Sequence, residues 1–147
     1  MTKVFRYLLD VNVLIALLDE DHIHHQVVLD WFYTPGLQWA ICAFTEAGFL
    51  RHMTRPKIGD MSMEAATAML ERLAREPGYH YLTLSADWRT MTKPFFQRIF
   101  GHKQITDAYL LGLAVREKLT LVTLDKAILH LAGEHRSHVL LLSGLTQ

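Results

Sequence analysis

The sequence predicts an α/β fold in which a parallel sheet of about five strands is covered by helices on both faces. Five short apolar runs rich in strand-forming residues alternate with segments of helical periodicity, which is typical of right-handed βαβ units. The strand runs are apolar along their whole length, as a sheet buried on both faces requires. The 147 residues suffice for one domain, and we expect a single domain over residues 1–147.

The expected elements follow from apolar spacing and from helix and turn signals. The expected strands are 4–9, 38–42, 80–84, 120–123 and 138–142. The expected helices are 11–18, 25–33, 44–54, 63–76, 107–117 and 125–132, with a further helical segment at 87–100 that Pro94 should break or kink. Ser62 and Thr106 are suitable N-cap residues. Two consecutive helices, 44–54 and 63–76, follow the second strand, and we expect them to form a clip at one end of the sheet.

Composition excludes several classes of protein. The 15 basic and 15 acidic residues balance, so a polyanionic partner would have to meet a local basic patch. The single cysteine, Cys42, excludes a disulfide within the chain. No segment resembles a signal peptide or a membrane span, which predicts a cytoplasmic protein without membrane contact. The histidines at 22, 24 and 25 lack the spacing of a zinc site.

Four acidic residues stand out because of their positions relative to the predicted elements. Asp10 closes the first strand, Glu46 follows the second, and Asp125 follows the fourth. The carboxyl ends of parallel strands share one edge of the sheet, where ligands bind, so these three carboxylates should lie at that edge. Asp107 begins the helix that leads into the fourth strand, and in the simplest topology such a helix should not begin there.

Carboxylates gathered at one edge would repel one another unless a cation compensates them. Mg²⁺ or Mn²⁺ takes oxygen ligands and keeps several waters, so the pattern indicates metal-assisted hydrolysis of a phosphodiester. Asn12 and Thr123 are neutral polar groups that could hold metal-bound waters or a substrate phosphate. Each acidic residue taken alone also fits an ordinary helix cap, and only their joint placement favours a site.

Four motifs carry a resemblance to a known family: LLDVNVLI at 8–15, TEAGFLR at 45–51, ITDAY at 105–109 and TLDK at 123–126. With these motifs in this order, nearly the whole chain resembles a PIN domain, in particular the VapC-like toxin ribonucleases of bacterial type II toxin–antitoxin pairs. The resemblance implies that the catalytic and metal-binding residues are Asp10, Glu46, Asp107 and Asp125, with Asn12 and Thr123 as supporting polar groups.

The same resemblance implies a three-layer α/β/α sandwich and endonucleolytic cleavage of RNA with Mg²⁺ or Mn²⁺. It implies that the helix carrying Asp107 points its start into the acidic pocket. It also implies two kinds of protein partner, namely a second copy in a homodimer and a cognate antitoxin that inhibits the enzyme.

Basic and aromatic residues near the motifs suggest contacts beyond the acidic pocket. Arg51, His102 and Lys103 are candidates for contact with RNA or the antitoxin. The segment 87–100 has more large apolar residues than one helix face can bury, namely Trp88, Phe95, Phe96, Ile99 and Phe100. They fit either core packing or, for the excess, a dimer or antitoxin surface.

Two alternatives remain open from the sequence. A phosphatase similar to haloacid dehalogenases also begins with an aspartate after a strand, but it needs a second aspartate two residues later, where this chain has Asn12. A PIN-like module could also bind RNA or protein without turnover. Nucleotide-binding glycine motifs and a Gly-x-Ser-x-Gly motif are absent from the sequence.

Overall fold

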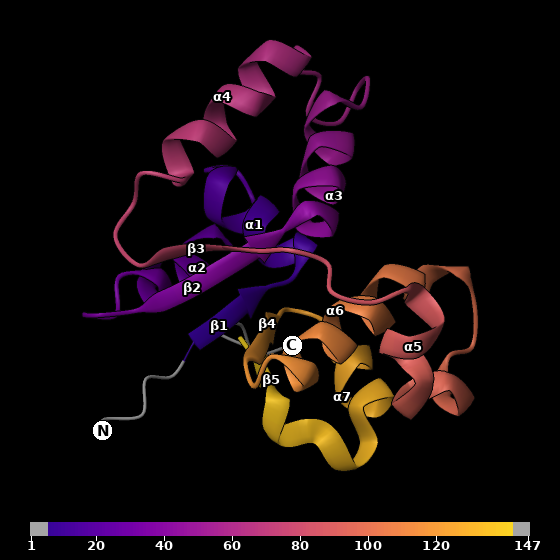
Figure 1. The fold of residues 1–147 in the computed structure, drawn as a ribbon. Helices are drawn as coiled ribbons and strands as arrows, with labels where there is room; N and C mark the ends of the chain where they lie inside the picture. The colour runs from indigo at the N-terminus through magenta and orange to yellow at the C-terminus, as the bar shows by residue number, and fades with distance from the viewer. Residues whose placement is uncertain (1–5, 143–147) are drawn as a thin grey trace.

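A parallel five-stranded sheet forms the middle layer of the computed structural model, which describes residues 6–142 (Figure 1). Its strands are β1 (Arg6–Leu9), β2 (Gln38–Cys42), β3 (Tyr79–Leu82), β4 (Thr120–Thr123) and β5 (Val139–Leu141). The spatial order is β3-β2-β1-β4-β5, and every neighbouring pair is parallel. β2 and β4 have the predicted bounds. Residues 4 and 5 of the first predicted strand lie outside the described residues.

The central strand β1 shows why its sequence is apolar throughout. Successive side chains of a strand point to opposite faces, and Leu8 and Leu9 are both fully buried. Leu8 packs in the hydrophobic cluster beneath one helical layer and Leu9 in the cluster beneath the other. Both faces of the sheet are therefore covered, as the sequence predicted.

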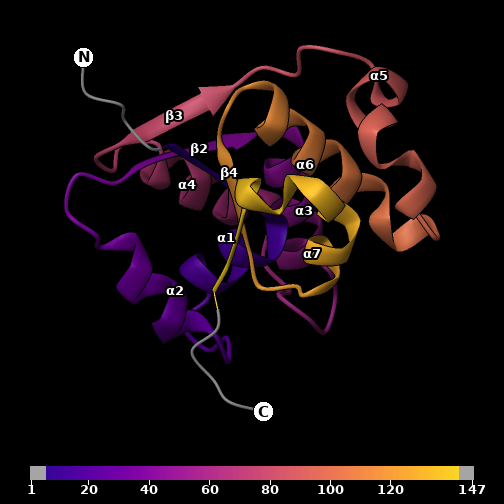
Figure 2. The ribbon, with the colours of Figure 1, turned by 90° about the horizontal axis from the view of Figure 1, so that it is seen from below.

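The helices divide between the two faces according to the order in which the chain builds the sheet (Figures 1 and 2). One face is covered by α1 (Val11–Leu18), α2 (His25–Phe32), α3 (Ala43–Thr54) and α4 (Met63–Leu73). The other face is covered by α5 (Trp88–Thr92), α6 (Ile105–Arg116) and α7 (Ala127–Ala132). Right-handed crossovers require this change of face, because the chain moves from β1 through β2 to β3 and then returns to the opposite side of β1.

The return of the chain creates a topological switch point between β1 and β4. β1 pairs with β2 on one side and with β4 on the other. In open α/β sheets, ligands bind outside the carboxyl ends of the strands at such a point. Asp10 and Asp125, which follow these two strands, are therefore the best placed of the acidic residues.

The clip expected after the second strand is present as the pair α3 and α4, which rises from the sheet in Figure 1. Ser62 caps α4 as predicted, because its Oγ accepts a hydrogen bond from the backbone N–H of Ala65 at 3.0 Å. α4 ends at Leu73, earlier than expected.

The segment at 87–100 breaks at Pro94, as predicted. α5 is followed by the 3₁₀ helix η1 (Lys93–Arg98), which has Pro94 in its first turn. A proline is tolerated there because the backbone N–H groups of a first turn make no hydrogen bond within the helix. Two further 3₁₀ helices are η2 (His102–Gln104) and η3 (Gly133–His138). Of the helices in residues 6–142, none is long and apolar enough to cross a membrane.

Candidate active site

Asp10 is held rigidly at the end of β1, where it also caps α1. Its side chain is only 3% exposed. Oδ1 accepts a hydrogen bond from the N–H of Val11 at 2.8 Å, and Oδ2 accepts one from the hydroxyl of Thr123 at 2.6 Å. Burial raises the pKa of the Asp10 carboxyl, while these two hydrogen bonds oppose that rise.

Thr123 and Asn12 join the start of α1 to the loop after β4. The buried Thr123 hydroxyl, besides donating to Asp10, accepts the backbone N–H of Asp125 at 3.1 Å. Oδ1 of Asn12 accepts the N–H of Leu124 at 3.3 Å. Both residues therefore position the acidic residues across the switch point.

Asp125 lies in the loop between β4 and α7 and is exposed. Its Oδ1 accepts the N–H of Ala127 at 2.9 Å, just before the first turn of α7. Its charge contributes to the raised pKa of Asp10, so the two carboxylates lie near one another.

Asp107 approaches this pair from the first turn of α6, as the family resemblance implied and contrary to what the simplest topology suggested. α6 delivers the chain to the amino end of β4 and so runs antiparallel to the strands. Its 12 residues span about 18 Å, whereas β4 with its 4 residues spans about 13 Å. The start of α6 therefore reaches the carboxyl edge of the sheet. The predicted N-cap was wrong, because Thr106 lies inside α6, and Gln104 occupies the N-cap without a side-chain capping bond.

The charges of Asp10 and Asp125 both act on Asp107, so the three carboxyl groups lie in one region of the carboxyl edge. The pKa of Asp107 is raised from 3.8 to about 7, first by burial and then by the charges of Asp10 and Asp125. The ion pairs in the described part of the chain join Arg89 to Asp87 and His135 to Glu134, so no cationic side chain pairs with these aspartates there. We call these three residues the aspartate cluster.

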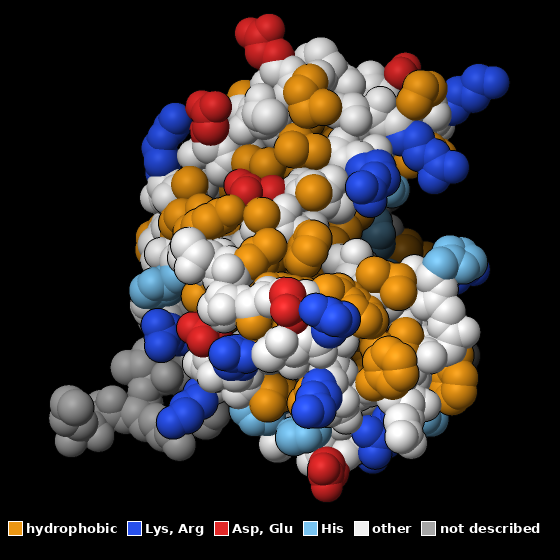
Figure 3. All heavy atoms as spheres, turned by 45° about the vertical axis from the view of Figure 1, so that its right-hand side comes forward, with side chains coloured by type: hydrophobic (Ala, Val, Ile, Leu, Met, Phe, Trp, Pro, Cys, Tyr) orange, Lys and Arg blue, Asp and Glu red, His pale blue; other side chains and the backbone are white. Residues whose placement is uncertain are grey.

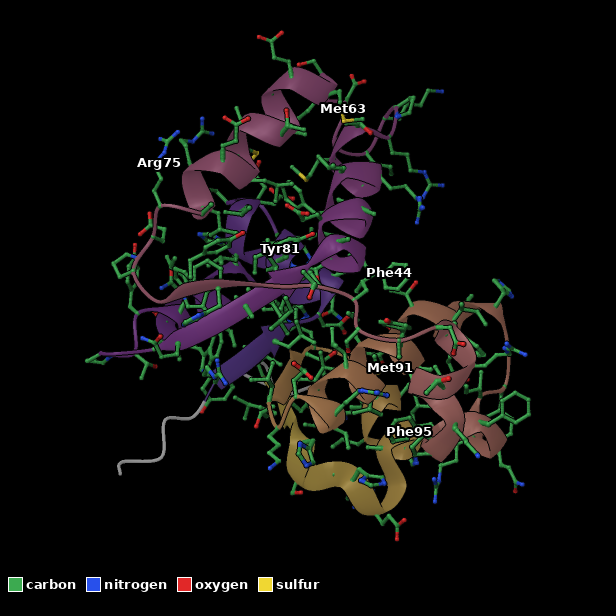
Figure 4. All side chains as sticks on the ribbon, viewed as in Figure 1. Phe44, Met63, Arg75, Tyr81, Met91 and Phe95 are labelled. Carbon is green, nitrogen blue, oxygen red and sulfur yellow. The ribbon has the colours of Figure 1, made fainter. Side chains whose placement is uncertain are left out.

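Glu46 lies apart from the aspartate cluster, in the first turn of α3. Burial raises its pKa, and a hydrogen bond with the Tyr81 side chain opposes the rise. Burial raises the pKa values of Tyr79 and Tyr81, and the charge of Glu46 adds to that rise. Figure 4 shows Tyr81 on the side of the sheet where α3 and α4 lie. Neither tyrosine was predicted as a site residue, although their alternate positions in a strand place both side chains on one face.

Two hollows adjoin the aspartate cluster, and Asp107 lines both of them. The first has a volume of about 440 Å³ and is also lined by Asp125 and by the predicted contact residues His102 and Lys103. The second, of about 740 Å³, runs along α3 and contains Arg51, the third predicted contact residue. Figure 3 shows Lys, Arg and His side chains around a hollow in the right-hand half of the molecule.

Of the basic residues at the end of α3, Arg51 was predicted from the sequence as a contact residue, whereas the surface that it shares with His52 and Arg55 was not. Arg51, His52 and Arg55 line the second hollow together. Phe44 also lines this hollow and packs edge-on against Tyr109 of α6, with 4.9 Å between the ring centroids. Figure 4 shows Phe44 at the base of α3, toward α6. Glu46 and Arg51 are separated by about 140° around a helix, which explains why Glu46 lines a different hollow beside α4.

The donor set of the aspartate cluster suits a hard divalent cation. Carboxylate oxygens are the ligands that Mg²⁺ and Mn²⁺ prefer, and the cluster carries uncompensated negative charge. Within residues 6–142, no three His, Cys, Asp or Glu side chains are gathered closely enough to hold an ion as they stand. The chemistry of the residues fits such an ion. Asp10 is buried, whereas the side chains of Asp107 and Asp125 are partly or fully exposed and have room to move toward an ion.

Comparisons with known proteins agree with this architecture. A family model described as PIN domain matches residues 7–134. The chain is 41% identical over 130 residues to Ribonuclease VapC38 of Mycobacterium tuberculosis, covering 86% of this chain and 90% of that protein. It is 36% identical over 126 residues to Ribonuclease VapC44 of the same organism, covering 84% and 88%. The fold is similar to a crystal structure of VapBC2 from Rickettsia felis bound to a promoter DNA fragment, with a TM-score of 0.61, 15% identity and coverage of 93% and 97%.

Proposed function

The chain belongs to the PIN domain family, and on this premise we infer that it is a ribonuclease of the VapC toxin type. We propose further that it is an endoribonuclease dependent on Mg²⁺ or Mn²⁺ and that it acts in the cytoplasm. The observation that carries the proposal is the aspartate cluster, in which three separate elements bring carboxylates to the switch point of the sheet.

Asp10, Asp107 and Asp125 would hold the divalent cation, with Asp10 as the fixed ligand. When bound, such an ion supplies an activated water and neutralises charge on the phosphoryl oxygens. Thr123 and Asn12 act as positioning residues, because their hydrogen bonds fix Asp10 and the loop that carries Asp125.

The basic residues beside the cluster would bind the RNA backbone. His102 and Lys103 lie in the hollow on one side of Asp107, and Arg51 lies in the hollow on the other. Contacts of this kind to phosphates position a strand without reading its sequence. An RNA strand held in both hollows would have a phosphate at Asp107, next to the other carboxylates.

We keep Glu46 in the proposed catalytic set as its outermost member. Its first-turn position on α3 and its carboxylate chemistry support that role, and its hydrogen bond with Tyr81 supports a different, structural one. The variant E46Q separates the two roles, because loss of a metal ligand lowers metal-dependent cleavage whereas loss of a tyrosine contact lowers only stability.

The central test is cleavage of a mixed RNA pool by purified protein with Mg²⁺, with Mn²⁺ and with a chelator. Wild-type protein should cleave internally with either metal. D10N should lose about 100-fold or more of the rate, because one lost ligand removes several kcal/mol of transition-state stabilisation. The matched control is D21N, which changes an exposed aspartate in the turn after α1. A PIN-like module without turnover would instead bind the RNA and leave it intact under all conditions.

We also propose a cognate antitoxin and a homodimer as partners. The similarity to a VapBC2 structure and to proteins named Ribonuclease VapC supports the first. Expression of the wild-type chain should arrest bacterial growth, and D10N should not. The mass in solution tests the dimer, which should weigh twice the 16.9 kDa of one chain. A monomer at micromolar concentration would contradict it.

A further inference from the structure

Phe100 stands at the rim of the first hollow with almost its whole side chain in solvent. It is 88% exposed and lies between η1 and η2. Phe95, which belongs to the same aromatic-rich segment, is by contrast fully buried in the core. Core packing therefore accounts for Phe95 and leaves Phe100 unexplained.

The backbone around Phe100 is fixed although its ring is free. The N–H of Phe100 donates to Oε1 of Gln104 at 2.6 Å, and the N–H of Gln104 donates to the carbonyl of Gly101 at 3.1 Å. These two bonds close the turn that leads into α6, whose first turn carries Asp107. The position of the ring is thus tied to the position of the aspartate cluster.

The chemistry of the hollow combines three kinds of group. Phe100 offers a flat apolar surface, His102 and Lys103 offer positive charge or hydrogen-bond donors, and Asp107 and Asp125 form the acidic wall. The volume of about 440 Å³ lies within the range of about 300–1,000 Å³ that small-molecule sites occupy. Proteins that bind single-stranded nucleic acid combine aromatic rings, on which the bases stack, with cationic side chains that contact the phosphates.

We propose that Phe100 stacks on an unpaired base of the substrate RNA next to the phosphate that is cleaved, while Lys103 contacts the adjoining backbone. This inference rests on the proposed ribonuclease function and adds to it a residue that contacts the base beside the cleaved phosphate. A base within a duplex cannot leave its stack to lie on Phe100 without the cost of unpairing, so the preferred substrate is a single strand or a loop.

Phe96 provides a matched control. It is 64% exposed on η1 but does not line the hollow. A protein partner that covered the exposed side chains of residues 96–100 would contact both phenylalanines, whereas a base held beside the aspartate cluster would contact Phe100 alone. The two variants therefore distinguish RNA from a second copy or another protein.

The experiment measures cleavage of a labelled single-stranded oligonucleotide that contains a mapped cleavage site, in Mn²⁺, by wild type, F100A, F100W and F96A. F100A should raise KM about 10-fold or more with kcat within about twofold, as expected for loss of one stacked base. F100W should keep the wild-type KM, and F96A should match wild type. Pairing the site with a complementary strand should lower kcat/KM for wild type to about the value that F100A has on the single strand.

The outcomes separate failure of this inference from failure of the proposed function. If wild type cleaves and F100A has an unchanged KM, base stacking by Phe100 is wrong. The same holds if F100A and F96A both change the mass in solution while cleavage stays the same, because the surface is then a protein interface. If wild type cleaves no RNA, the proposed function fails. Fluorescence anisotropy of the labelled strand then tests Phe100 directly, and equal affinity of F100A and F96A would overturn the inference.

Discussion

The variant D107N should make the protein more stable at neutral pH and less active. Between pH 3.8 and about 7, the folded protein keeps a proton on Asp107 that the unfolded chain has released. Stability therefore falls as the pH rises through this window, because the folded state binds more protons than the unfolded state. Asparagine does not titrate, so D107N does not undergo this loss of stability as the pH rises.

The magnitude follows from the size of the pKa shift. A rise from 3.8 to about 7, at 1.36 kcal/mol per pKa unit, sets an upper value of about 4 kcal/mol. Asp107 is partly exposed, and solvent screening reduces this value to about 2 kcal/mol. D107N and wild type should therefore differ little in their pH-dependent stability near pH 4, and D107N should be about 2 kcal/mol more stable at pH 8. Relief of the repulsion on Asp10 and Asp125 is part of this gain.

Urea unfolding at intervals from pH 4 to pH 8 measures the difference, with D21N as the control that should follow wild type. Mg²⁺ should stabilise wild type at pH 8 and narrow its gap to D107N, since a ligand that binds only the folded state adds to its stability. The reasoning is refuted if the curves of wild type and D107N stay parallel within about 0.5 kcal/mol over the whole range.

Two further substitutions test the framework around the site. T123V removes the hydroxyl that bridges Asp10 and the N–H of Asp125. It should lower the free energy of unfolding by about 2 kcal/mol, the value of a buried charge-assisted hydrogen bond. Urea unfolding measures this loss against T67V, whose hydroxyl bonds only within α4, and equal losses in the two variants would count against the bridge. G112A places a Cβ 2.2 Å from the backbone oxygen of Met91, so α5 can no longer pack as closely against α6. In a calorimetric scan, its Tm should fall by about 4–8 °C. The control G101A, whose Cβ meets nothing within 4 Å, should leave Tm unchanged.

Elements with strong local signals could be predicted from the sequence. β2 and β4 have the predicted bounds because their apolar runs are ended by turn or helix signals on both sides. The break at Pro94 followed from the missing N–H of proline. The cap of α6 was not predictable in this way, because Thr106 has the right side chain but the 3₁₀ turn at His102–Gln104 leads the chain into the helix two residues earlier than a cap at Thr106 allows.

The aspartate cluster could be predicted in part. Asp10 and Asp125 follow strands whose carboxyl ends must share an edge, so their meeting was expected. The approach of Asp107 was implied by the family resemblance but not by the pattern of elements alone, because it depends on the direction of α6 and on its length relative to β4. The position of Glu46 beside the tyrosines of β3 depends on how α3 is rotated about its axis, and periodicity does not determine that rotation when the helix is contacted on several sides.

The pairing of β1 with β4 has a consequence for the synthesis of the chain. The hydroxyl that fixes Asp10 belongs to Thr123, 113 residues further along, and Leu8 pairs with Leu121. While the chain emerges from the ribosome, β1, β2 and β3 can associate before the two later aspartates have emerged. Every product of interrupted translation that ends before residue 125 therefore lacks part of the aspartate cluster. A cell making this protein would meet its cleavage activity only once nearly the whole message has been read.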